Sequence, residues 1–578
     1  MIRTRSASVA VVLGLVSLLV AVWGLRSGPA RAELTDAAWT DGEYVHTAMS
    51  TRTTWCDTGL YRTSARGQFF TGALLGRSTD ATASLVPLLV RNPGSGSLPS
   101  PATATSLGDH AYANPVAVSA LRTAALDLGS PLTVPLADGA AAGLLSQYAR
   151  ATSTGVSAGA AGAVSDSGVV SAGTRTPGSG LPEVASVDVR TLAGSTLLAG
   201  GLGSGAAADL TDIRLRIGAV GSSIVQDGCL SAGTVTRDYG VAHLRLEERS
   251  TALAAVSTGM NSAAATLQSA LSAGGSVVTG LRNATLGVLT GPGGLLTLVG
   301  VGTPTATLTT SANLPQAVSA LTGRTLGTGT PVTLDLATGT TVVDLAALTD
   351  PTTGLNGRPP NSEVLTTATL GSAVSSVGTL LAGQRTEVLS TARSALDSAS
   401  ATLVVTVPLT LLNSAVSLGT LQITASGTLA TLAAGTGTVT WSGLNSCGVT
   451  TAAVCTAVNT LMPTLVPLIR TALATSLTST LYGLSGAEAA FIGTVTSAVD
   501  TATSLVGTGI NALPNVVSVH VNAQPDQPGA RTPTVPLAPG ELAVSAIRVG
   551  LVPVTRLGWL AFATSSSGPT GYSPVTGT

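Results

Sequence analysis

The pentapeptide at residues 155–159, Gly-Val-Ser-Ala-Gly, matches the G-x-S-x-G pattern of serine hydrolases. In those enzymes a strand enters a strained turn that opens a helix, and the turn exposes the serine hydroxyl beside backbone N–H groups. Here the match lies in a tract of Gly, Ala, Ser and Thr, where such a pattern arises easily by chance. A secreted serine hydrolase that uses Ser157 is therefore the alternative functional hypothesis.

A nucleophilic serine needs a base, usually a histidine. His243 and His520 both lie in alternating segments with polar neighbours, so we expect both side chains to face solvent. His46 and His110 lie near carboxylates, but their spacing fits no common metal motif, and we expect them in solvated loops. The sequence therefore predicts no catalytic, cofactor-binding or metal-binding residue, and no cofactor.

The first 32 residues have the pattern of a secretory signal peptide. Arg3 and Arg5 precede an apolar run over residues 9–25, and Ala30-Arg31-Ala32 supplies a small-x-small cleavage site. We expect cleavage between Ala32 and Glu33, which predicts a secreted or cell-surface protein. The alternative is an uncleaved membrane anchor, because the apolar run is nearly long enough to span a bilayer.

Four cysteines follow the predicted cleavage site, and an exported chain permits disulfides. Cys447 and Cys455 are close in sequence across a turn-rich stretch, so we expect them to pair locally. Cys56 and Cys229 form the other predicted pair by default. The alternative is a set of free buried thiols.

The composition excludes several classes of function. All 27 basic residues are arginine, the formal net charge is -1 and only 10% of the 578 residues are charged. The chain thus lacks a basic stripe for nucleic acid, and it has no lysine for Schiff-base, P-loop or isopeptide chemistry. Apolar residues make up 44%, which favours a folded chain with a core of many small side chains.

The hydrophobic pattern changes along the chain. Residues up to about 248 contain short alternating runs that predict antiparallel strands. Beyond them, apolar residues recur every three or four positions near 253–271, 374–399, 473–484 and 492–506, and strand pairs are predicted at 403–425 and 517–549. The predicted fold is a β-rich N-terminal region followed by α+β layers, in several domains. We expect a β-rich domain at 33–250, α+β units at 251–361, 362–449 and 450–565, and a flexible tail at 566–578.

We expect no transmembrane segment after signal removal, because the apolar runs at 295–301 and 403–412 are too short. The tail residues Ser573 to Gly577 resemble a degenerate sortase signal, but neither a hydrophobic span nor a basic end follows them. The expectation is release from the cell, or attachment to the envelope that is not covalent.

Several stretches together resemble the choice-of-anchor G proteins of actinobacteria. They are residues 39–41 and 65–72, 147–151 and 157–168, 343–348 and 355–361, and 521–524 with 546–549. The resemblance implies an exported surface protein and supplies no catalytic residues. The leading hypothesis is therefore a structural or adhesive protein whose partners are components of the cell envelope or extracellular matrix.

Overall fold

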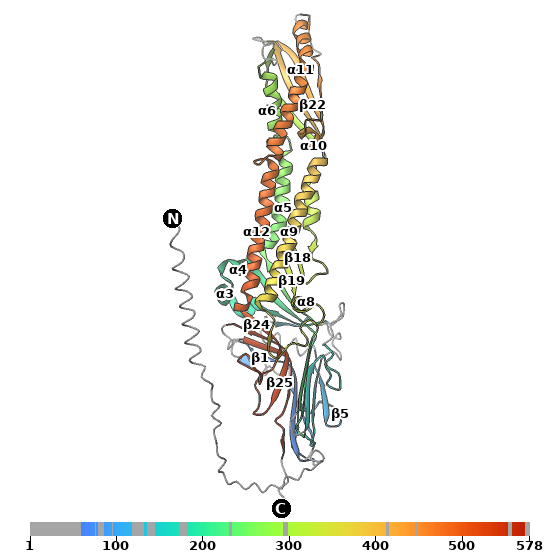
Figure 1. The fold of residues 1–578 in the computed structure, drawn as a ribbon, viewed down its shortest axis with the longest axis vertical. Coiled ribbons are helices and arrows are strands. Elements are labelled where there is room, and N and C mark those ends of the chain that lie inside the picture. The colour runs from blue at the N-terminus through green and yellow to red at the C-terminus, as the bar shows by residue number, and fades with distance from the viewer. Residues whose placement is uncertain are drawn as a thin grey trace, which may run out of the picture. The chain divides into compact units, whose positions relative to one another are not determined.

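The computed structural model (Figure 1) describes residues 59–74, 77–78, 86–94, 96–117, 132–135, 145–172, 182–229, 234–292, 299–411, 416–444, 448–449, 451–552 and 558–572. All of them belong to one compact unit, Cys56–Thr578. The predicted signal peptide, its cleavage site at Ala32 and Glu33, and the cysteines Cys56 and Cys447 lie outside the described residues.

The first sheet joins the two ends of the described chain. Its antiparallel strands follow the order β20 (Ser362–Glu363), β24 (Val517–Ala523), β25 (Leu542–Leu551), β26 (Gly558–Ser567), β1 (Tyr61–Leu74), β3 (Leu88–Asn92) and β4 (Leu98–Ser100), while β2 (Arg77–Ser78) and β27 (Gly571–Tyr572) also pair with β1. Since β1 lies between β26 and β3, residues from the predicted first and last domains share one sheet.

The second sheet packs face to face against the first. It has the order β13 (Thr234–Val241), β12 (Val220–Asp227), β9 (Val156–Gly162), β8 (Ser146–Ala151), β6 (Ala111–Pro115) and β5 (Thr105–Gly108). The two backbones approach closely: a Cβ at Gly67 would lie 2.3 Å from the carbonyl oxygen of Ala160, and one at Gly159 would lie 2.4 Å from that of Arg66. Only glycine fits these two positions, so the two sheets can approach closely there.

A third sheet supports the helices. Its order is β17 (Thr325–Leu326), β18 (Val332–Asp335), β19 (Thr340–Asp344), β14 (Leu244–Ser250), β11 (Leu210–Gly218), β10 (Glu183–Asp188) and β7 (Leu132–Thr133). The short helices α3 (Val189–Leu202), α4 (Ser204–Asp209) and α8 (Leu345–Thr349) pack on its strands. These three sheets and three short helices are called the base below.

Long amphipathic helices extend from the base (Figure 1). The helices α5 (Thr251–Ala270), α9 (Thr367–Ser398) and α12 (Ala487–Ala512) pack together with the shorter α7 (Leu314–Thr322), and the 3-10 turn η5 (Leu513–Asn515) follows α12. Buried residues on α9 recur every three to four positions, among them Leu370, Val377, Leu381 and Val388. Side chains of Ser250, Asn313 and Thr366 accept hydrogen bonds at the first turns of α5, α7 and α9, so polar caps fix where these helices begin.

A fourth sheet lies with α6 and α11 at the other end of these helices from β24 and β25 (Figure 1). It has the order β15 (Val299–Val301), β21 (Ser400–Leu411), β22 (Ser417–Thr428) and β23 (Thr438–Ser442), and β16 (Thr305–Thr310) also pairs with β21. The helices α6 (Ser276–Thr290), α10 (Leu429–Ala433) and α11 (Ala452–Leu477) contact its strands, and the π-helix η4 (Thr478–Tyr482) continues α11. This sheet and its helices are called the distal module.

The predicted fold class is confirmed: a strand-rich N-terminal region precedes helices that alternate with antiparallel strands. The helix α3 buries Leu198 and Leu202, and it is interrupted at Gly194, which has a φ of 73°. One prediction differs from the structure. The predicted flexible tail is partly structured, since β26 ends at Ser567 and β27 pairs with β1, so the tail prediction is wrong for residues 566–572.

One helical stretch among the described residues, Ala452–Asn515, is long and apolar enough to cross a membrane. Of its most apolar part, 28% is buried. Val458, Met462 and Leu465 of α11 belong to the hydrophobic core. A core helix satisfies the same criterion of length and composition, so the absence of a spanning segment stays a prediction.

Candidate functional site

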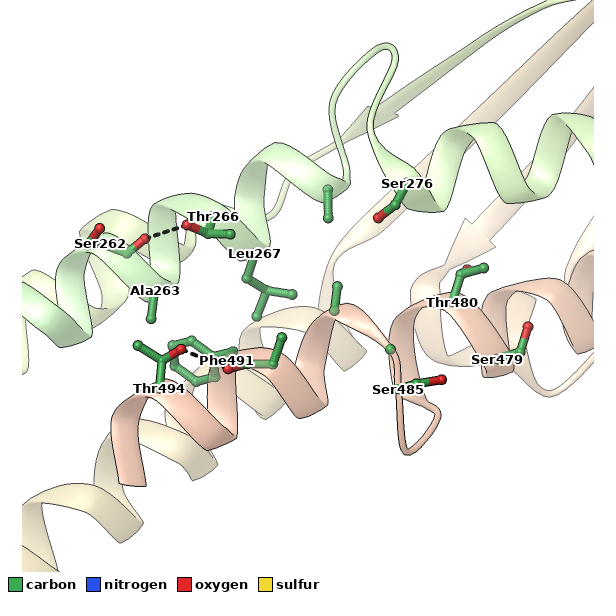
Figure 2. A pocket seen from close by; sticks show the side chains of 14 residues that line it. Ser262, Ala263, Thr266, Leu267, Ser276, Ser479, Thr480, Ser485, Phe491 and Thr494 are labelled. Atoms are coloured by element: carbon green, nitrogen blue, oxygen red, sulfur yellow. Dashed lines mark hydrogen bonds between the residues drawn. The ribbon is translucent and has the colours of Figure 1, made fainter. Parts of the chain in front are cut away.

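A pocket of about 660 Å³ lies where two long helical stretches, α5 with α6 and α11 with α12, are interrupted. Figure 2 shows its walls: α5 and the start of α6 on one side, and η4 with the start of α12 on the other. Gly274 and Gly275 separate α5 from α6, while Gly483 and Gly486 separate η4 from α12. The two helix breaks therefore coincide at the pocket.

The pocket is chemically neutral. Its lining consists of Ser, Thr, Ala and Gly with two larger side chains, Leu267 and Phe491, and includes no titratable residue. Several hydroxyls already donate within their own helices: Thr266 donates to the carbonyl of Ser262 at 3.0 Å, and Thr480 to that of Ser476 at 2.7 Å. Because general acid–base catalysis requires a titratable group, these walls are suited to packing or to binding a neutral molecule.

Ser157 does not occupy a nucleophile elbow. It lies inside strand β9, is fully buried between the first two sheets, and its hydroxyl is 2.6 Å from the hydroxyl of Ser567. A second serine pair, Ser222 with Ser565, joins the same two sheets at 2.8 Å. The Ser157 tract therefore contributes small polar contacts to a sandwich interface, and its surroundings give the hydrolase hypothesis no specific support.

His520 is buried, so the expectation that it faces solvent is wrong. Its side chain lies in a cross-strand row with Glu363 on β20 and Arg548 on β25, and only 3% of the residue is exposed. The reason is the segment after β24, which covers this face: Val535 packs against Trp559 and Ala561, and the Arg548 guanidinium donates to the carbonyl of Pro533 at 3.0 Å.

This environment shifts the titration of all three groups. Burial, and then the charges of Arg548 and Arg531, lower the pKa of His520 to about 4. Burial likewise raises the pKa of Glu363 and lowers that of Arg548 to about 10. The Nε2 atom of His520 lies 3.4 Å from Oε2 of Glu363, but the imidazole is neutral at pH 7, so the contact is not an ion pair. His243, the other histidine considered as a base, is half-buried between β13 and β14 rather than solvent-facing within a strand.

The described stretches on which the family resemblance rests all fall in the base. They supply parts of β1, β8, β9, β19, β24 and β25, together with α8 and the segment before β20. Two of them meet directly, since the Asn361 N–H donates to the carbonyl of Asn522 at 2.9 Å. Nothing in the spacing of these two stretches along the chain predicted the contact.

The exposed face of the distal sheet carries a regular array, called the threonine face below. The strand registers define three cross-strand rows: Thr309, Thr402, Ser426 and Thr438; Thr307, Val404, Thr424 and Thr440; Thr305, Thr406, Gln422 and Ser442. Every one of these side chains is neutral and at least partly exposed, whereas the alternate residues of β21 and β22 are buried under the helices. Sequence reasoning predicted β21 and β22 but missed β16, β23 and the array, because the array depends on register.

Cys229 and Cys455 are not free thiols, and both are disulfide-bonded. Their predicted partners, Cys56 and Cys447, lie outside the described residues, so the two pairings remain predictions. Among the described residues no group of three or more His, Cys, Asp or Glu side chains is arranged to hold a metal ion.

The family model described as Domain of unknown function (DUF8394) matches residues 65–568. This match covers most of the chain, and the protein therefore belongs to that family. No curated protein and no solved structure matches the chain.

Proposed function

We propose that this protein is an exported surface protein that acts by binding, in a structural or adhesive role, and that the threonine face is its contact surface. The observation that carries the proposal is the neutral, regular array on the distal sheet. The resemblance to choice-of-anchor G proteins and the predicted signal peptide support export. The neutral walls of the pocket at the two helix breaks and the burial of Ser157 favour binding over catalysis.

The physical basis is preorganisation. Threonine is β-branched and loses little rotamer freedom when a partner approaches, and strands held in a sheet place its hydroxyl and methyl groups about 4.8 Å apart across strands. Residues 398–487 contain one charged residue, Arg470. A neutral partner rich in hydroxyl groups would therefore displace few strongly hydrated charges when it binds the threonine face. A rigid array of this kind can gain affinity from many weak contacts, because its side chains lose little conformational entropy when the partner binds.

The test is binding of the purified protein to intact cells and to isolated cell envelopes. Replacing Thr424→Glu and Thr440→Glu places two charges at the centre of the threonine face, and we expect retention to fall at least tenfold. The matched control is Thr456→Glu with Thr460→Glu, two exposed positions on α11 in the same module, which should retain binding within twofold. Equal retention by both variants would overturn the proposal.

Mass spectrometry of the exported protein should also find Glu33 as its first residue.

A further inference from the structure

An arginine-lined groove lies on the face of the first sheet formed by β1 and β3, away from the threonine face. It has a volume of about 790 Å³ and lies between strands β1 and β3 and the segments at 536–541 and 568–569. Arg62, Arg66 and Arg91 line it, together with one carboxylate, Glu541, so the charges of its lining residues sum to +3 − 1 = +2. In a chain with a net charge of -1 and 10% charged residues, this is an unusual local concentration of positive charge.

The three guanidinium groups have no carboxylate partner among the described residues. Arg62 and Arg91 are exposed and make no side-chain ion pair in that part of the chain, while Arg66 donates to the side chain of Gln68. The Nε atom of Arg66 is buried without a hydrogen-bond partner. Glu541 offsets one of the three charges but forms no ion pair with these arginines among the described residues: its carboxylate accepts hydrogen bonds from the hydroxyl of Ser566 and from the N–H of Ala538 at 2.8 Å. The positive charge is thus left for a ligand.

The strand geometry spaces the arginines for a polymer. Arg62 and Arg66 lie four residues apart on the same face of β1, which corresponds to about 13 Å, and Arg91 lies on β3 opposite Ser64, midway between them. A single small anion reaches one or two of these groups. A chain with an anionic group on successive units contacts all three.

The walls indicate the kind of polymer. Besides the arginines, Glu541 and three uncharged polar residues, they are apolar and rich in proline, with Pro87, Pro93, Pro536, Leu537 and Pro569. Flat apolar walls pack against the C–H faces of sugar rings, while a guanidinium forms paired hydrogen bonds with a carboxylate. The polar side chains nearby are already engaged: Ser64 donates to the carbonyl of Gly568 at 2.9 Å, and Thr63 to that of Thr152 at 2.7 Å.

We propose that the groove lined by Arg62, Arg66 and Arg91 binds an acidic polysaccharide that carries carboxylate groups. The inference deepens the proposed function and rests on it, because the groove would hold the base to an acidic envelope or matrix glycan while the distal module presents the threonine face. Binding of this kind is largely electrostatic and weakens as salt screens the charges.

The experiment measures binding of the purified protein to polygalacturonate, a polymer with one carboxylate on each sugar, by titration at low and high salt. The double variant Arg62→Gln with Arg91→Gln should bind at least tenfold more weakly and lose most of the salt dependence. The matched control, Arg245→Gln with Arg282→Gln, removes the same charge from other surfaces and should bind within twofold of the unaltered protein. Equal loss in the two double variants would overturn the inference, because net charge alone would then explain binding.

Two further polymers and one further variant complete the test. Neutral dextran should not bind, and binding of dextran as tight as that of polygalacturonate would refute a charge-based site. Tight binding of polyphosphate without binding of polygalacturonate would also overturn the assignment to a carboxylated glycan. The Thr424→Glu and Thr440→Glu variant should keep its affinity for polygalacturonate, so a failure of the threonine face and a failure of the groove are distinguishable.

Discussion

The side chain of Asn361 pairs with the backbone of Gln524 as a neighbouring strand would: Oδ1 accepts from the Gln524 N–H at 2.8 Å, and Nδ2 donates to the Gln524 carbonyl at 3.0 Å. Nδ2 also lies within hydrogen-bond distance of the carbonyls of Gln527 and Pro528. Asn361 has a φ of 57°, a left-handed conformation that asparagine tolerates better than most residues. One side chain therefore extends the pairing of β20 with β24 and fixes the start of the segment that buries His520.

Asn361→Ala should destabilise the protein by roughly 2–3 kcal/mol, because it removes these hydrogen bonds and leaves a Cβ in a left-handed conformation. Asn361→Gly loses the same hydrogen bonds without the steric penalty, so its loss should be smaller by about 1 kcal/mol. Urea unfolding measures both. Equal losses for Ala and Gly would contradict a role for the backbone conformation, and an unchanged midpoint for both would contradict the pairing itself.

Sequence patterns predicted those parts of the fold that depend on local periodicity. The three- and four-residue steps at 253–271 and 374–399 correspond to α5 and α9, and the alternation at 403–425 corresponds to β21 and β22. In both cases one buried face repeats along the segment, which is a property readable from neighbouring residues.

The remaining features depend on long-range contacts. His520 shares one face of β24 with the polar residues Ser518 and Asn522. It is nevertheless buried, because a segment beyond its strand folds back over that face. The arginines of the groove stand at 62, 66 and 91, and their grouping depends on the pairing of β1 with β3 and on a wall formed by residues near 536 and 568. Neither the register nor the wall leaves a local pattern, so neither site could be predicted from the sequence.

The free energy of unfolding should decrease as the pH rises from about 4.5 to 8, because of the buried carboxyl of Glu248. Burial, and then the negative charge of Asp209, raise the pKa of this carboxyl on β14 to about 8, while the neighbouring Thr341 hydroxyl opposes the shift only in part. Below pH 4.5 the carboxyl is protonated in both states. Between pH 4.5 and 8 only the unfolded chain releases the proton, which lowers the free energy of unfolding by up to about 1.4 kcal/mol per pH unit.

The check is urea unfolding of the unaltered protein and of Glu248→Gln between pH 5 and 9. The free energy of unfolding of Glu248→Gln should depend less on pH than that of the unaltered protein. The variant should gain most in stability relative to the unaltered protein at pH 8. Glu247→Gln is the control, since that neighbouring carboxylate is partly exposed on the other face of the strand and bonded to Arg216. A profile for Glu248→Gln that parallels the unaltered protein would contradict the prediction.

Glu488 should stabilise the junction between the helices and the distal module more than Asp397 does. The Arg393 guanidinium on α9 contacts both carboxylates and lies 4.3 Å from the centre of the Tyr482 ring, so it joins α9 to the helix break between η4 and α12. The side chain of Glu488 is 11% exposed and that of Asp397 is 38% exposed. Solvent screens the exposed pair more strongly.

We expect Glu488→Gln to lower the free energy of unfolding by roughly 1–2 kcal/mol, and Asp397→Asn by less than about 0.5 kcal/mol. Hydrogen exchange across residues 478–490 should increase selectively in Glu488→Gln, because the contact spans the helix break. Equal effects of the two substitutions, or an increase spread evenly over the chain, would show that Arg393 does not act as a local clamp.

The two predicted disulfides should differ in their contribution to stability. A Cys56–Cys229 bond closes a loop of more than 170 residues and should stabilise the folded chain by up to roughly 4–5 kcal/mol on the chain-entropy model. A Cys447–Cys455 bond closes a short loop and should contribute roughly 2–3 kcal/mol.

Peptide mapping without reduction should recover Cys56 linked to Cys229 and Cys447 linked to Cys455. Cys229→Ser should then reduce the unfolding midpoint in urea more than Cys455→Ser does, and the difference between the two variants should vanish when the unaltered protein and both variants are unfolded under reducing conditions. Recovery of any other pairing, or of four free thiols, would overturn the assignment, and a larger loss in Cys455→Ser would contradict the loop-length argument even if both bonds were found.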